Sequence, residues 1–197
     1  MLSESERSTL LRIAWTTLEH HFGSRIPYAP MLSDELIAFR SVFVTLRNRG
    51  RLRGCRGVVQ ALVPLWQAIE EMTLSAALHD SRFKRVSADE IQDLSIEISV
   101  LSSFEQFRAA DDLCIGTHGV MIRCGGRHGL LLPQVGSDME WSAVELLRQV
   151  CIKAHLPPES WRRPDAVLER FTAEAFSSGP LGHAASRAEI PPHLARS

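Results

Sequence analysis

The sequence has few of the features that mark secreted or membrane-bound proteins. Its start, Met1 to Glu6, has no basic segment followed by an apolar one, and no apolar run approaches the roughly 18 residues of a membrane span. Cysteine is scarce, with four in the chain and no CxxC pair. We therefore expect a cytoplasmic protein with free thiols rather than a disulfide framework.

Net charge is also small, at -1 over 197 residues, which argues against a chain that binds nucleic acid over its whole surface. Hydrophobic residues make up 45% of the chain and charged residues 23%, as in ordinary globular proteins. A chain of this length supports one substantial core, which hides roughly 70% of the surface of the extended chain. Any basic binding surface must therefore be local.

Acidic residues are absent from one long stretch, 36–69, which is rich in arginine instead. Within it, the motif Leu-Arg-Gly-Cys-Arg-Gly at Leu52 to Gly57 follows an apolar run at Val42 to Leu46 and a turn at Asn48 to Gly50. Glycines let a backbone approach a ligand closely, and arginines present forked donors suited to phosphate or carboxylate. The motif therefore predicts an anion site.

Hydrophobic periodicity predicts helices interrupted by single strands and hairpins. Apolar spacings of three and four indicate helices, strict alternation indicates strands, and Gly-containing links between neighbouring strands indicate hairpins. The expected helices are 5–22, 64–79 and 137–154, and the expected strands are 42–46, 52–59, 94–100, 119–123, 128–132 and 167–176. Without repeating βαβ units, this order predicts an α+β fold, mainly an antiparallel sheet with flanking helices.

Two serine–glutamate pairs have the spacing of a capping box, at which a helix begins. Ser87 with Glu90 predicts a short helix, and Ser137 with Glu140 predicts the start of the longer helix that follows. At the other end of the chain, residues 177–197 show no periodicity and are rich in Gly, Pro, Ala and Ser. We expect a disordered tail there.

Six short motifs follow one another along the chain. They lie at Phe43–Leu46, Leu52–Gly57, Asp80–Phe83, Ile96–Leu101, Gly129–Val135 and Leu156–Trp161. In this order they resemble the AMMECR family, named after the AMME chromosomal region, whose bacterial and archaeal members are often called AmmeMemoRadiSam system protein A. The resemblance covers roughly Leu10 to Phe176, so we expect an AMMECR-type domain over residues 1–176.

The resemblance implies a cytosolic α+β domain with a larger and a smaller subdomain, both built around antiparallel sheet. It implies no established activity, no catalytic residue and no known cofactor. Prokaryotic members look linked with a radical-SAM protein and with a Memo-type protein that is similar to non-haem iron dioxygenases. The resemblance therefore implies these two partners and a shared modification pathway.

One residue of the motif departs from the family pattern, because the position of Arg56 is usually an isoleucine. An arginine cannot pack in a core as isoleucine does without a buried partner. Either that face of the strand is open in this chain, or the arginine reports a changed ligand preference.

Cys55 is open to three interpretations. Free cysteines are commonly small buried hydrophobic residues. Alternatively Cys55 is a reactive thiol, since guanidinium groups such as that of Arg53 favour the thiolate. In the third interpretation the motif has a purely geometric role, such as a tight turn against a ligand. A regular strand places Arg53 and Cys55 on one face, whereas a bulge would rearrange both.

The surrounding polar residues carry similar alternatives. The arginines form either a solvated hairpin tip or an anion site without the aromatic residues that nucleic-acid bases stack on. If Arg47 and Arg51 face one another across the turn, an anion would relieve their repulsion. Asp80 and Arg82 are either a cap with a salt bridge or a place where Arg82 captures an anion beside the Gly54–Gly57 backbone. Glu97 either lies on the solvent face of its strand or is a buried partner for one of the arginines.

Two hypotheses of function follow. The first is an enzyme or accessory subunit that acts on an anionic small molecule in the radical-SAM and Memo pathway. The second is a non-catalytic protein-binding module that uses the exposed arginine-rich hairpin, with Cys55 only packed. No metal site is expected, because Cys124 and His128 supply only two ligands. The candidate catalytic residue is Cys55, and the candidate ligand-binding residues are Arg53, Gly54, Gly57, Asp80, Arg82 and Glu97.

Overall fold

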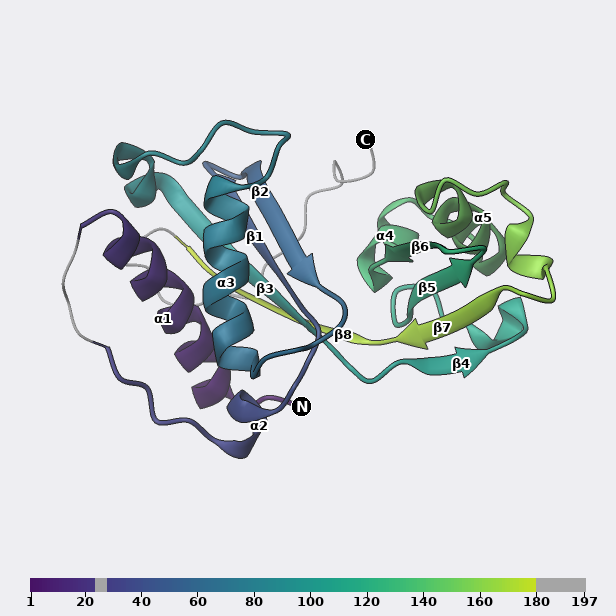
Figure 1. Ribbon diagram of the computed structural model, residues 1–197, viewed down its shortest axis with the longest axis horizontal. Coiled ribbons are helices and arrows are strands. Elements are labelled where there is room, and N and C mark those ends of the chain that lie inside the picture. The colour runs from purple at the N-terminus through teal and green to yellow at the C-terminus, as the bar shows by residue number, and fades with distance from the viewer. Residues whose placement is uncertain (24–27, 180–197) are drawn as a thin grey trace. The chain divides into compact units, whose positions relative to one another are not determined.

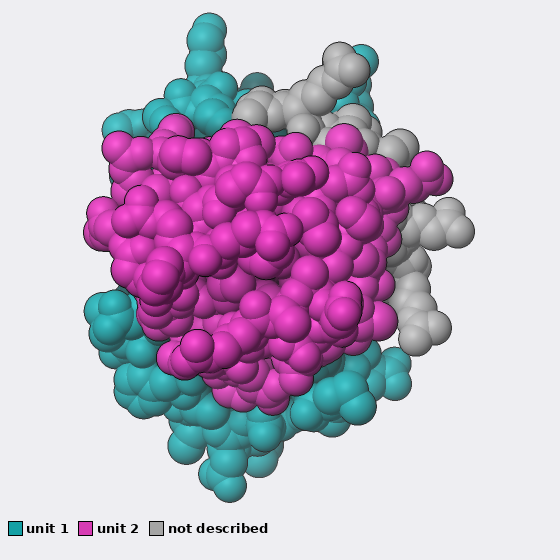
Figure 2. Space-filling model, turned by 90° about the vertical axis from the view of Figure 1, so that its right-hand side faces the viewer, with its two compact units in different colours: residues 1–100, 174–188 teal, residues 101–173, 189–197 magenta. Residues whose placement is uncertain are grey.

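The computed structural model describes residues 1–23 and 28–179 (Figure 1). These residues divide into two compact units, which Figure 2 colours separately: unit 1 holds 1–100 and 174–179, and unit 2 holds 101–173. Of the tail expected at 177–197, all but its first three residues lie outside the described part. No helix within that part is both long and apolar enough to cross a membrane.

Unit 1 is built on a sheet whose edge strand carries the Leu-Arg-Gly-Cys-Arg-Gly motif. The strand β1 (Val42–Asn48) pairs antiparallel with both β2 (Arg51–Val58) and β3 (Leu94–Leu101), so β2 has a free edge. Arg49 and Gly50 join β1 to β2 with φ of 49° and 79°, the pattern of a two-residue type I′ turn, and the expected hairpin is confirmed. In spatial order the strands are β2, β1, β3 and β8 (Ala173–Ser178).

Helices cover one face of this sheet. Figure 1 shows α1 (Glu4–His21) and α3 (Leu65–Leu78) side by side on that face, where α3 packs against β1 and β2. Alternate strand residues point into the core between sheet and helices, as expected for Ile96, Ile98 and Val100. The shorter helices of unit 1 are α2 (Asp34–Ile37) and the 3₁₀ helix η1 (Ala88–Asp93), which begins at the expected Ser87–Glu90 capping box.

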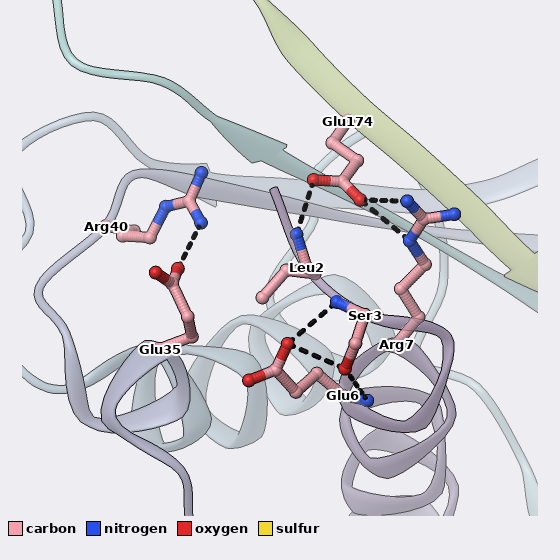
Figure 3. Close-up of polar contacts among 7 residues, drawn as sticks. All are labelled: Leu2, Ser3, Glu6, Arg7, Glu35, Arg40 and Glu174. Atoms are coloured by element: carbon pink, nitrogen blue, oxygen red, sulfur yellow. Dashed lines mark hydrogen bonds and ion pairs between the residues drawn. The ribbon is translucent and has the colours of Figure 1, made fainter.

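The N-terminus is fastened to the last strand of the sheet (Figure 3). Glu174 on β8 accepts hydrogen bonds from the Leu2 backbone N–H at 3.1 Å and from the Arg7 Nε at 2.7 Å. The capping box of Ser3 and Glu6 starts α1 immediately after this contact. The returning strand β8 and the first helix therefore stabilise one another.

Unit 2 has its own sheet and its own core. Its elements are β4 (Glu105–Phe107), η2 (Ala110–Asp112), β5 (Gly119–Cys124), β6 (Arg127–Leu131), α4 (Pro133–Asp138), α5 (Ala143–Lys153), η3 (Ser160–Arg162) and β7 (Val167–Phe171). The strand order is β4-β7-β5-β6, with antiparallel pairing at each step. The hairpin expected around Gly125 and Gly126 is confirmed, and both units together have the expected α+β fold.

Two expected elements of the C-terminal half are wrong in detail. The expected helix 137–154 begins later, because Ser137 belongs to the short helix α4 and the capping box is formed instead by Ser142 with Glu145. The expected strand 167–176 is two strands, β7 and β8, which separate at Thr172. Thr172 and Ser102 hydrogen-bond to one another where the chain passes between the units, so one strand cannot serve both sheets.

Candidate functional site

The motif strand β2 contains a bulge. Thr45 pairs with Cys55 and Leu46 with Gly54, but Arg47 pairs with Leu52, so Arg53 has no partner on β1. An extra residue of this kind bends a strand and disturbs its alternation. Arg53 and Cys55 therefore do not follow the regular-strand geometry, which is the alternative that the sequence left open.

Arg53 binds the protein itself. Its Nε and Nη2 donate to the two carboxylate oxygens of Glu90 at 2.7 Å and 2.9 Å. Its guanidinium also donates to the backbone carbonyls of Lys84 at 2.6 Å and Arg85 at 3.0 Å. These hydrogen bonds from Arg53 are the main reason that the pKa of Glu90 falls to about 2, despite partial burial. A ligand that bound Arg53 would have to replace these acceptors.

Asp80 holds the free edge of β2 beside Cys55. Its Oδ2 accepts the backbone N–H of Cys55 at 2.9 Å, and the guanidinium of Arg82 donates to both of its oxygens, at 3.0 Å and 2.8 Å. The hydrogen bonds from Arg82 hold the pKa of Asp80 far below its usual range, although burial acts in the opposite direction. The structure thus brings Cys55, Asp80 and Arg82 together.

Arg82 lies within electrostatic reach of the Cys55 sulfur. Its pKa is raised, first by its hydrogen bonds to Asp80, then by the charge of Asp80 and to a smaller extent by electrostatic interaction with Cys55. The side chain of Arg82 is 49% exposed, whereas that of Asp80 is only 5% exposed. Arg82 therefore offers a partly solvated positive charge next to the thiol.

The two glycines of the motif make room for protein atoms. A Cβ on Gly54 would lie 2.1 Å from the backbone oxygen of Ala76 in α3, and a Cβ on Gly57 would lie 2.1 Å from Cδ1 of Phe43. The close approach that glycine permits is therefore to a helix at one position and to an aromatic ring at the other. Arg56, between them, is exposed and donates to the carbonyl of His79 at 3.0 Å, so its face of the strand is open there.

The face of the sheet that points away from α3 carries a group of polar side chains beside Phe43. In the register of the three strands, Cys55, Thr45 and Glu97 form one row across it. The Thr45 hydroxyl donates to the Cys55 sulfur at 3.3 Å. We call this surface the polar face and define it by Thr45, Arg47, Cys55, Ser95, Glu97 and Ser99.

Arg47 is buried on the polar face, and its two terminal nitrogens find no acceptor among the described residues. Its side chain follows Thr45 on the same side of β1, and the residue is 7% exposed. Both Nη1 and Nη2 are covered and make no hydrogen bond to any described residue. Arg47 pairs with Leu52 and Arg51 pairs with Asn48, so the two arginines do not face one another across the turn.

Glu97 lies diagonally across from Arg47, because Thr45 pairs with Glu97 and Arg47 pairs with Ser95. Burial raises the pKa of Glu97, and the charge of Arg47 partly opposes this effect. Among the described residues no salt bridge joins the two side chains, since Nη1 and Nη2 of Arg47 have no partner there. Glu97 is half-buried, so it is neither fully on the solvent face nor a buried ion-pair partner of Arg47.

Sequence reasoning missed Thr45 and Arg47 as members of this site. The signal was available, because Phe43, Thr45 and Arg47 alternate with the core residues of β1. No strong metal signal accompanies it: among the described residues no three His, Cys, Asp or Glu side chains gather as ligands. Cys124 instead lies 3.7 Å from Asp165, and all four cysteines are free thiols.

Comparisons with known proteins agree over nearly the whole chain. The family model AMMECR1 matches residues 11–176. A protein of Methanothermobacter thermautotrophicus is 38% identical over 183 residues, which cover 89% of this chain and 95% of that protein. A protein of Thermococcus gammatolerans is 37% identical over 180 residues, covering 85% of this chain and 87% of that protein.

A solved structure supports the same conclusion. The crystal structure of protein PH0010 from Pyrococcus horikoshii is similar with a TM-score of 0.81 and 32% sequence identity. The similarity covers 91% of this chain and 94% of that one. Sequence motifs, fold and relatives all agree, and the chain belongs to the AMMECR1 family.

Proposed function

We propose that unit 1 binds an anionic small molecule at the polar face, beside Cys55. The observation that carries this proposal is the buried guanidinium of Arg47, which has no partner for Nη1 or Nη2 among the described residues. A buried charge without a partner is strongly unfavourable, and an anionic group is the partner that relieves it. The polar face is thus a surface that folding alone does not explain.

Arg47 and Arg82 come from two different segments near Cys55. Arg47 follows Thr45 on β1, and Thr45 donates to the Cys55 sulfur at 3.3 Å. Arg82 is held by Asp80 next to the Cys55 backbone N–H. A carboxylate or phosphate between Arg47 and Arg82 would lie against the thiol. In this proposal Arg47 and Arg82 bind the anion, Asp80 positions Arg82, and Cys55 is the candidate reactive group.

The remaining predicted site residues have supporting roles in the proposal. Arg53 and its acceptor Glu90 hold the edge strand in place, and the glycines at 54 and 57 allow α3 and Phe43 to approach it. Glu97, whose pKa is raised by burial, would release or take up a proton when an anion binds beside Arg47. Such proton linkage would make anion binding stronger at lower pH, where Glu97 is neutral.

The test is a thermal-shift screen against carboxylated and phosphorylated metabolites. Selective binding to the folded state raises the melting temperature. We expect at least one anion to stabilise the wild type and to have no effect on Arg47→Met. Arg51→Met is the matched control, because Arg51 is exposed on the same hairpin. Equal stabilisation of all three proteins would contradict an anion at Arg47.

The role of Cys55 is tested by alkylation with iodoacetamide and peptide mapping. Cys114 is exposed and Cys151 is buried, so both serve as internal references in one sample. If the anion lies against Cys55, the ligand from the thermal screen will slow alkylation of Cys55 and leave that of Cys114 unchanged. Protection of neither thiol would remove Cys55 from the site but leave the anion site standing.

We place this anion-binding chain in the cytosol as an enzyme or accessory subunit of the pathway that the family resemblance implies, with a radical-SAM protein and a Memo-type protein as partners. Support for this placement comes from the resemblance alone. Co-expression of tagged versions of the three proteins of one organism, followed by affinity purification, tests it. Absence of any association, together with unchanged metabolite profiles after deletion of the gene, would argue against the placement.

The second candidate is a protein-binding module that uses the hairpin tip. One observation favours it: Arg49 and Arg51 are exposed at the tip, where Arg49 is held by an ion pair with Asp93 at 2.8 Å. This candidate requires no ligand at Arg47. It would be preferred if Arg51→Met weakened association with a partner protein while Arg47→Met did not.

A further inference from the structure

Unit 2 contains a cavity of its own, separate from the polar face. Its volume is about 470 Å³, which falls in the range of small-molecule sites. The edge strand β4, the strand β7 and the segment that starts with η3 form its walls. Of the sequence motifs only Leu156–Trp161 reaches this cavity, at Trp161, because the lining residues come from two segments far apart along the chain.

The cavity combines apolar and cationic walls. Phe107, Trp161 and Leu168 are each less than a tenth exposed and supply apolar surface. Arg108, Arg162 and Arg163 line the same space and are exposed. An apolar floor with a few polar groups at its rim is the usual composition of a site that binds one small organic molecule.

Positive charge exceeds negative charge at this rim. Arg163 donates to both oxygens of Asp165, at 2.8 Å and 2.9 Å. Arg162 donates to Glu159 at 2.9 Å, but Glu159 also accepts from Arg148 at 2.7 Å and so serves two arginines. The carboxylates of Asp165 and Glu159 therefore neutralise only part of the positive charge of Arg148, Arg162 and Arg163.

Arg108 has no acceptor for its guanidinium among the described residues. The nearby carboxylate of Asp112 is occupied by the backbone N–H groups of Arg108 and Ala109, at 3.4 Å and 3.0 Å. Arg108 follows directly after Phe107, the last residue of β4, so its position at the cavity is set by a strand that pairs with β7. A positioned and uncompensated guanidinium is suited to bind a carboxylate or phosphate.

Trp161 supplies a second unpartnered donor. Its indole Nε1 is covered and has no acceptor among the described residues, and the guanidinium of Arg162 lies 4.2 Å from the centre of the ring. A buried N–H without an acceptor is unfavourable. Because the nitrogen is covered, a ligand oxygen can reach it only if the ring turns, and such a turn changes the fluorescence of the indole.

We propose that this cavity binds a small organic anion, with its charged group on Arg108 and its apolar part against Phe107, Trp161 and Leu168. The volume is that of a single small molecule, and the three apolar side chains favour a ligand with an aromatic or branched aliphatic body. Carboxylates and phosphate monoesters share the required chemistry. This site is distinct from the anion site proposed in unit 1, and neither depends on the other.

The experiment uses the full chain and three probes with the same ring: phenylacetate, phenyl phosphate and the neutral phenylacetamide. Binding is measured by isothermal titration calorimetry and by tryptophan fluorescence. We expect one of the two anions to bind at least about tenfold more tightly than the amide, as for loss of one charge-assisted hydrogen bond. Which anion binds better distinguishes the carboxylate from the phosphate.

Two variants locate the binding. Arg108→Gln should weaken binding of the preferred anion about tenfold or more. Arg127→Gln removes the same charge from unit 2 at a residue outside the cavity wall and should change nothing. Trp161→Phe should abolish the ligand-induced change in fluorescence, with circular dichroism as the check that the variant folds.

Two results would overturn the proposal. One is binding of the neutral amide as tight as that of the anions, or no binding of any probe up to millimolar concentration. The other is an equal effect of Arg108→Gln and Arg127→Gln, which would indicate general attraction to positive charge. The unit 1 variant Arg47→Met should bind these probes normally, so failure of one proposed site is distinguishable from failure of the other.

Discussion

At the scale of single residues, Arg47 lies in an environment that is unusual for arginine, because its charged group is buried away from water. It is 7% exposed, and two of its nitrogens have no partner among the described residues. Arginines at such positions are normally paired, because removal of the charge from water is costly. A position that is poor for stability and is nevertheless occupied by arginine is best explained by a ligand.

Arg47→Met should therefore stabilise the protein in the absence of a ligand. Methionine fills a similar volume without a charge, and such replacements of buried ions are neutral or stabilising, here by about 1–3 kcal/mol. The variant also loses the favourable interaction between the charges of Arg47 and Glu97. This loss matters less at pH 5 than at pH 7, because Glu97 is more often neutral at the lower pH, so the gain in stability should be larger at pH 5. Urea unfolding of the wild type and the variant measures the change.

Arg51→Met is the control for that measurement, with an expected change within about 0.5 kcal/mol because Arg51 is exposed. A loss of stability in Arg47→Met that exceeds the change in Arg51→Met would mean that the fold needs the guanidinium. Arg47 would then be a structural residue, and the anion proposed at the polar face would lose its main support.

The residues of the site were predictable in kind but not in their pairing. The sequence placed a thiol, glycines and arginines in one motif and suggested that Arg82 lies beside it, and the structure brings Arg82 to Cys55. It did not indicate that Arg53 would be held by Glu90, since the two are 37 positions apart. Contacts between residues so far apart in the sequence depend on how the loop after α3 returns to the sheet. Hydrophobic periodicity predicts helices and strands but not the path of such a loop.

At the scale of elements, the loop between α3 and β3 acts as a clamp on the free edge of β2. Asp80 binds the backbone at Cys55, and Glu90 binds Arg53 with both oxygens. A free edge is a site for unwanted pairing with other chains, and a covering loop prevents it. Asp80 in the same loop also sets the position of Arg82. One loop therefore both protects the strand edge and positions a residue of the candidate site.

The clamp should make stability depend on acid. Arg53 lowers the pKa of Glu90 from 4.5 to about 2 in the folded chain. Between these values the unfolded state binds more protons, so the contribution of Glu90 is complete above about pH 4.5 and is lost as the pH falls toward 2. Urea unfolding from pH 7 to pH 2.5 should show this loss, of about 2 kcal/mol.

Glu90→Gln should be less stable than the wild type at pH 7 and should lose less stability on acidification. Part of the slope will remain, because the pKa of Asp80 is also depressed by Arg82 and acts with the same sign. Glu71→Gln, at an exposed position of α3, serves as the control and should follow the wild type. Parallel curves for all three proteins would exclude Glu90 as a source of the acid sensitivity.

The two motif glycines should differ in their tolerance of alanine. In Gly54→Ala the new methyl group meets the backbone oxygen of Ala76, so helix α3 has to move away from the sheet. In Gly57→Ala it meets the Phe43 side chain, Cγ included, which can move away by a change of rotamer without a shift of backbone. We expect Gly54→Ala to cost about 2–3 kcal/mol and Gly57→Ala clearly less, measured by urea unfolding. The reverse order would mean that α3 moves more easily than the ring.

The elements themselves were largely predictable because their sequence signals are local. The helix at 65–78 and the strand at 94–101 follow directly from apolar spacing, and Ser87 with Glu90 marks the start of η1. The prediction was wrong where two local signals competed. Ser137 and Ser142 are each followed three residues later by glutamate. Ser137 lies inside the short helix α4, which begins at Pro133, and only Ser142 caps a helix, α5.

At the scale of the whole molecule, the chain is organised as one unit inserted into another. Unit 1 is left after β3 and re-entered at β8, and residues 101–173 form unit 2. The ends of the inserted segment meet, because the Ser102 backbone N–H donates to the Thr172 carbonyl at 2.9 Å and the Thr172 N–H donates to the Ser102 hydroxyl at 2.9 Å. Neither sequence composition nor motif order indicated where this insertion begins.

A segment whose ends meet and whose core is its own should fold alone. Unit 2 has a buried cluster around Val120, Ile122, Leu147 and Val150 that involves no residue of unit 1. We expect an isolated fragment 101–173 to give dispersed NMR signals and a cooperative thermal transition, although at this size its stability will be only marginal. Substitution of Leu147 by alanine in the fragment should abolish the transition, because a cavity of this kind costs roughly 2–5 kcal/mol. A fragment that stays unfolded in buffer would show that unit 2 depends on the rest of the chain for its stability, and the anion cavity at Arg108 would then have to be studied only in the full-length protein.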